Sequence, residues 1–130
     1  MATVEKLEKE KQAIESSVTA KKTELGKAKK ADKELVQSEL DAISAQLRDT
    51  ILRLDASIAD VINHMQANID RMEREGTTSA PPLDRMSPDN AGKTQYEIDK
   101  AILAEYQAKR DSLASQYPEV FRTEVIEAEQ

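Results

Sequence analysis

The fold is decided by residues 40–69, which read LDAISAQLRDTILRLDASIADVINHMQANI. Large apolar side chains recur here at intervals of 3, 4, 4, 3, 4, 4, 3 and 4 residues. This eleven-residue repeat corresponds to about 3.67 residues per turn, so the apolar side chains stay on one face of an α-helix. We call this set the apolar stripe, and it consists of Leu40, Ile43, Leu47, Ile51, Leu54, Ile58, Ile62, Met65 and Ile69.

The same periodicity extends toward the N-terminus, where the apolar spacing also fits a heptad. No proline occurs in residues 1–80, and Gly26 is the only glycine before Gly76. A turn near residues 26–33 is one alternative, because polar residues occupy the stripe positions there and Asp32 could cap a new helix. Because the stripe resumes in phase at Val36, we instead expect one continuous or gently bent helix over residues 1–75.

The end of this helix has clearer local signals than its middle. Gly76 follows two arginines and suits the left-handed conformation that often ends a helix. Residues 76–94 are rich in proline and are predicted to form an extended linker or an ordered crossover loop. Thr94, with a glutamate three residues later, predicts the start of a C-terminal helical module over residues 95–130. We expect that module to dock onto a partner through Tyr106, Tyr117 and Phe121.

The composition predicts an all-α, elongated coiled-coil-type protein. Charged residues make up 34% of the chain and aromatic residues only 3%, so large core-filling groups are scarce. There is no cysteine, which excludes disulfides and thiolate chemistry. No signal peptide or membrane-spanning segment is evident, and we therefore expect a cytoplasmic protein, or a virion protein if the source is viral.

Catalytic and metal-binding chemistry finds little support in the sequence. Gly92, Lys93 and Thr94 resemble the end of a phosphate-binding loop, but the upstream glycine is replaced by Ser87 and no strand pattern precedes it. His64 is the only histidine, so one chain cannot form a two-histidine metal site. We expect no enzymatic activity, cofactor, metal or small-molecule substrate.

Charge is distributed unevenly along the chain. Residues 1–30 carry eight lysines against five glutamates, +3, whereas residues 31–130 carry 11 basic against 20 acidic residues, −9. A lysine cluster lies in residues 21–33, without arginine or aromatic residues among its lysines. Stacking on bases or reading base edges is therefore not predicted, and neither a nucleic acid nor a membrane is the expected partner. We interpret the cluster as a solvated face or a contact with an acidic neighbour.

The apolar stripe needs a cover, because burying each Ile or Leu is worth roughly 1.5–3 kcal/mol. Residues 95–130 are too short to cover a helix of 75 residues, so we expect other chains to do so. The isoleucine-rich stripe favours a homo-oligomer of three or four chains. The predicted function is that of a non-catalytic spacer, connector or fibre-like element in a larger protein assembly, such as a phage virion or tail. A coiled-coil adaptor or assembly chaperone, which binds a client on the stripe, is the alternative.

Overall fold

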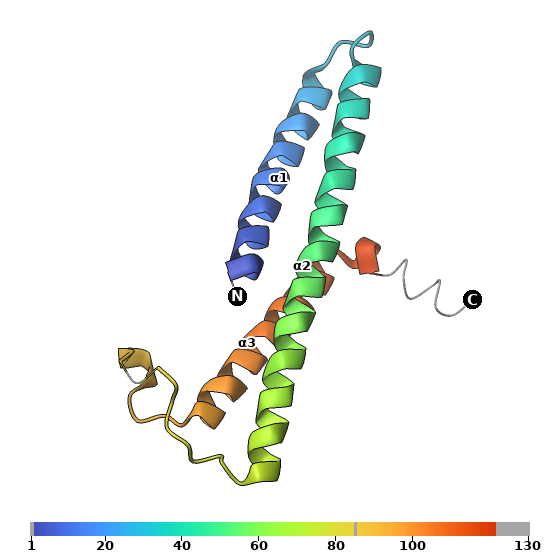
Figure 1. Ribbon diagram of the computed structural model, residues 1–130. Helices are drawn as coiled ribbons and strands as arrows, with labels where there is room; N and C mark the ends of the chain where they lie inside the picture. Colours follow the sequence, from blue (N-terminus) through green and yellow to red (C-terminus); the bar gives the residue numbers. More distant parts are fainter. Residues whose placement is uncertain (1, 85, 122–130) are drawn as a thin grey trace, which may run out of the picture. The chain divides into compact units, whose positions relative to one another are not determined.

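The computed structural model describes residues 2–84 and 86–121, and these residues form an all-helical structure without strands. They divide into two compact units, of which unit 1 contains residues 2–57 and 118–121 and unit 2 contains residues 58–117. The elements in chain order are α1 (Ala2–Lys27), α2 (Lys33–Glu75), the 3-10 helix η1 (Pro88–Asn90), α3 (Gln95–Gln116) and a helical turn at residues 118–121 (Figure 1).

The prediction of one continuous helix over residues 1–75 is wrong, because residues 28–32 form a turn between α1 and α2. In this turn the Asp32 N–H donates to the Lys29 carbonyl at 2.8 Å, and the Val36 N–H donates to the Asp32 carbonyl at 3.0 Å. Asp32 thus occupies the N-cap position of α2. In-phase spacing at Val36 therefore does not require a continuous helix, because a turn can also place the apolar face of α2 against α1.

Unit 1 is a helical hairpin. α1 lies along the first part of α2 and runs in the opposite direction (Figure 1). The buried apolar side chains of this unit are Val4, Leu7, Val36, Leu40, Leu47, Ile51, Leu54 and Val120. The polar residue Thr50 is buried as well, and its hydroxyl accepts a hydrogen bond from the Arg53 guanidinium at 3.4 Å.

Unit 2 is a second antiparallel helix pair, made of residues 58–75 of α2 and of α3 (Figure 1). Gly76 has a φ of 71°, and the Thr77 N–H donates to the Met72 carbonyl at 2.9 Å, so the predicted helix end is confirmed. Tyr96 Oη donates to the Glu73 carboxylate at 3.1 Å and links α3 to α2. The buried apolar side chains are Ile58, Ile69, Met72, Tyr106 and Leu113.

The described residues between α2 and α3 form an ordered crossover loop rather than an extended linker. The Gln95 N–H donates to the Ala80 carbonyl at 3.0 Å, and the Leu83 N–H donates to the Gln95 side-chain carbonyl at 2.8 Å. Thr94 caps α3 as predicted, because its hydroxyl oxygen accepts from the Glu97 N–H at 3.2 Å. These bonds hold the loop against the start of α3 while the chain reverses direction.

Candidate association surface

The apolar stripe lies largely within the folded chain. Ile43, Ile62 and Met65 are half-buried. Much of the stripe's cover comes from the chain itself, since α1 folds back along residues 33–57 and α3 folds back along residues 58–75. Whether the stripe also takes part in self-association stays a prediction. The six buried members of the stripe are Leu40, Leu47, Ile51, Leu54, Ile58 and Ile69.

Burial is uneven along α1. Val4 and Leu7, near the start of the helix, are 1% and 7% exposed. The apolar residues closer to the turn, Ile14, Val18 and Leu25, are only half-buried. A pair of helices buries one seam between them and leaves both flanks of that seam open to solvent. The turn half of the hairpin therefore offers apolar surface to a further helix.

Lys21 forms a polar link across the hairpin. Its Nζ lies 2.8 Å from a carboxylate oxygen of Glu39 on α2 and 3.0 Å from one of Glu24 on α1. The hydrogen bond to Glu39, followed by that to Glu24, raises the pKa of Lys21 above its ordinary value of 10.5. The sequence places Lys21 in the lysine cluster but cannot pair it with Glu39, because only the hairpin brings the two together.

We expect the contribution of Lys21 to stability to disappear in alkaline solution. A raised pKa in the folded state means that the stabilisation is complete below about pH 10.5 and is lost as the pH rises further. Melting temperatures of the wild type and of Lys21→Met, measured by circular dichroism between about pH 9 and pH 12, should therefore shift in favour of the variant above that value. Lys6→Met is the matched control, since the exposed Lys6 on the same helix forms no ion pair with a described residue. A constant difference between wild type and Lys21→Met across this range would contradict the pairing.

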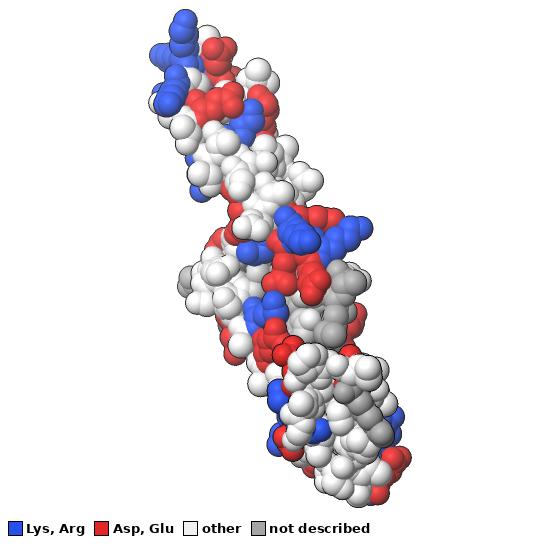
Figure 2. Space-filling view, turned by 90° about the vertical axis from the view of Figure 1, so that its left-hand side faces the viewer, with Lys and Arg blue, Asp and Glu red and all other residues white. Residues whose placement is uncertain are grey.

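The other lysines of the cluster surround the turn. Figure 2 shows basic side chains gathered at the turn between α1 and α2, with acidic side chains beside them. None of these lysines forms an ion pair with another described residue. Their ammonium groups are therefore available to a partner with carboxylates or phosphates. The exposed lysines are Lys22, Lys27, Lys29, Lys30 and Lys33.

The predicted docking residues differ in burial and belong to different units. Tyr106 is 6% exposed, and its ring therefore packs inside the described structure. Tyr117 is half-buried in unit 2, and Phe121 is half-buried in unit 1. Docking of a partner through these three residues stays a prediction.

The residues that resemble a phosphate-binding loop, the single histidine and the acidic side chains do not form a chemical site in the described structure. Gly92 has a φ of 75° in the turn before α3, and Thr94 is engaged as the helix cap. Asp49 pairs with Arg53 at 3.1 Å on the same helix, and His64 is exposed. Within residues 2–84 and 86–121, no three histidine, cysteine or acidic side chains come together as a metal site would require. None of the helices in that part of the chain is both long and apolar enough to cross a membrane.

Comparison of the chain with models of protein families, with curated proteins and with solved structures found no match in any of the three. The proposals below therefore rest on the residues and geometry of the chain itself.

Proposed function

We propose that the chain is a non-catalytic protein that acts through helix-to-helix association, with copies of itself, as a structural component of a larger protein assembly. The observation that carries this proposal is the incomplete cover of apolar residues between the middle of the hairpin and its turn, mainly on α1, although Val36 and Leu40 of α2 are buried. There Ile14, Val18 and Leu25 on α1 and Ile43 on α2 are half-buried, whereas Val4 and Ile51 are each 1% exposed.

Packing energetics supports a further helix at this place. Each large aliphatic side chain gains roughly 1.5–3 kcal/mol on full burial, so completing the cover of several half-buried residues is a sizeable driving force. Three or four helices around one seam are the usual arrangement in which helical proteins complete such a cover. A second copy of the same hairpin supplies the required apolar faces.

The proposed biological role is that of a spacer, connector or fibre-like element, and a phage particle is one assembly that would use such a component. We expect three or four copies in the isolated oligomer. Helical side chains, rather than a ligand pocket, would determine which partners bind.

Sedimentation velocity and equilibrium on the purified chain, together with far-ultraviolet circular dichroism, test the proposal. The expected result is a discrete oligomer with high helical content over a range of protein concentrations. A monomer at every concentration would contradict self-association. A monomer that forms a complex only with a client helix would instead favour an adaptor or chaperone, which must displace α1 to reach the buried Ile51 and Leu54.

A further inference from the structure

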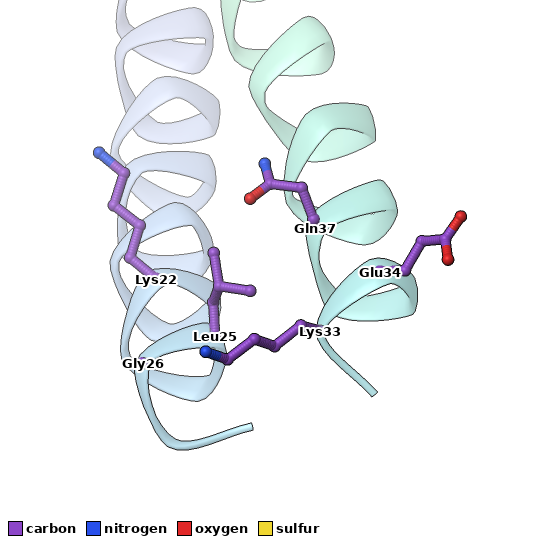
Figure 3. Close-up of a pocket in the computed structure, with 6 residues that line it drawn as sticks. All are labelled: Lys22, Leu25, Gly26, Lys33, Glu34 and Gln37. Carbon is purple, nitrogen blue, oxygen red and sulfur yellow. The ribbon is translucent and has the colours of Figure 1, made fainter. Parts of the chain in front are cut away.

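The hairpin of unit 1 has an open groove beside its turn, which we call the Leu25 groove (Figure 3). It has a volume of about 720 Å³. Leu25 points into the space between the helices, and Lys33 extends from α2 toward α1 (Figure 3). The groove is lined by Lys22, Leu25 and Gly26 from α1 and by Lys33, Glu34 and Gln37 from α2.

The other flank of the same turn carries an exposed leucine. Leu35 is 64% exposed, whereas Val36 and Leu40 on the same helix are 5% and 7% exposed. Leu35 lines a smaller hollow of about 360 Å³ together with Glu24, Lys27, Asp32 and Glu39. We call this surface the Leu35 flank.

The two surfaces lie on opposite sides of the helix pair. Successive residues of an α-helix are rotated by about 100°, because one turn contains 3.6 residues. Val36 is the buried residue that faces the hairpin seam, so Leu35 and Gln37 lie about 100° from it in opposite directions. One copy of the chain can therefore present its Leu35 flank while its Leu25 groove stays open.

The Leu25 groove has room for an additional side chain. Gly26 contributes no side chain to the Leu25 groove, and a Cβ placed there would have no atom within 4 Å. The space beside Leu25 is thus free for an incoming aliphatic side chain. Leu35 of another copy supplies one, and burying it removes apolar surface from water on both partners.

The charges of the two surfaces are also complementary. The Leu25 groove carries Lys22 and Lys33 against Glu34, a net charge of +1. The Leu35 flank carries three carboxylates, of Glu24, Asp32 and Glu39, against Lys27, a net charge of −2. Lys21 bridges two of these carboxylates, and the flank keeps a net charge of −1 when that lysine is included. Opposite signs of this kind set the orientation and partner choice of an interface.

We propose that the Leu35 flank of one copy binds the Leu25 groove of a second copy. The inference rests on the proposed self-association and names its interface. Because each copy uses two different surfaces, the contact is heterologous, and association continues until a ring closes or a filament forms.

Two single substitutions should weaken this interface without destabilising the fold of the hairpin. Leu35→Lys removes the apolar group and adds a positive charge to the acidic flank, while lysine favours a helix about as well as leucine. Gly26→Gln fills the Leu25 groove and improves helix propensity, so it should raise the melting temperature while it weakens assembly. Each variant should raise the dissociation constant at least about tenfold, which corresponds to about 1.4 kcal/mol. Leu83→Lys, at a loop leucine that is 91% exposed, is the matched control and should assemble like the wild type.

Mixing the two variants gives the sharpest test. Leu35→Lys keeps an intact Leu25 groove and Gly26→Gln keeps an intact Leu35 flank, so an equimolar mixture should form a 1:1 dimer and nothing larger. Sedimentation velocity of the separate and mixed proteins measures this directly.

If the wild type assembles and Leu35→Lys assembles equally well, the proposed interface is wrong, although self-association stands. A mixture without a dimer also overturns the interface. A monomeric wild type overturns both proposals, and its binding to vesicles of phosphatidylcholine and phosphatidylserine would assign the lysines to an anionic surface instead.

Discussion

Replacing Ile51 by alanine should lower the free energy of unfolding by about 2–5 kcal/mol. Ile51 is 1% exposed and is among the largest fully buried side chains of the described structure. The substitution removes apolar contacts and leaves a cavity that a pair of long helices closes only in part. Urea denaturation followed by circular dichroism measures the loss, at one fixed protein concentration because an oligomer gains stability with concentration.

Gln46→Ala is the matched control for Ile51→Ala. Gln46 lies on the same helix and is exposed, so its substitution should change the free energy of unfolding by no more than about 0.5 kcal/mol. Equal stability of the two variants in a monomeric sample would contradict the hairpin, because Ile51 would then be uncovered in the isolated chain. In a single continuous helix, by contrast, Ile51→Ala would weaken assembly and leave the isolated chain largely unaffected.

The helical content and two helix boundaries follow from local signals in the sequence. The eleven-residue apolar spacing predicts α2 because only a helix places those residues on one face. Gly76 and Thr94 identify the end of α2 and the start of α3 because a left-handed glycine and a capping hydroxyl act on adjacent backbone groups. Each of these features depends on neighbouring residues alone.

The hairpin turn was only the less favoured alternative, because its cause is not local. Gly26 and Asp32 are weak signals by themselves, and the apolar spacing continues in phase across the turn. A continuous helix requires that phase, and a hairpin is compatible with it because its loop can turn the two apolar faces toward each other. The choice between them depends on how much apolar surface is buried when α1 packs against α2, and the spacing of residues in the sequence does not determine that area.

The candidate association surface could be predicted only in part, for the same reason. The lysine cluster is visible as composition, but the Lys21–Glu39 pair joins residues 18 positions apart. Leu35 lies outside the apolar stripe, and its exposure follows from the direction from which α1 approaches α2. The two flanks of the turn therefore exist as distinct surfaces only after the hairpin has formed.

Replacing Tyr106 by alanine should lower the free energy of unfolding by about 3–5 kcal/mol, as for other aromatic side chains removed from a core. Tyr106 is 6% exposed on α3, and with Leu113, which is 4% exposed, it forms the buried face of that helix. The sequence instead assigned Tyr106 to partner docking, which requires an accessible ring. The two roles predict different results in the isolated protein.

A docking residue that is free of the core can be removed without loss of stability, whereas a core residue cannot. Denaturation of Tyr106→Ala should therefore show a large loss, and Glu105→Ala, at the adjacent exposed position, should stay within about 0.5 kcal/mol of the wild type. Equal stability of the two variants would mean that the Tyr106 ring lies outside the core, and it would support the prediction that Tyr106 docks onto a partner. The expected loss would mean that α3 holds unit 2 together through Tyr106, and a partner would have to recognise α3 by its exposed face.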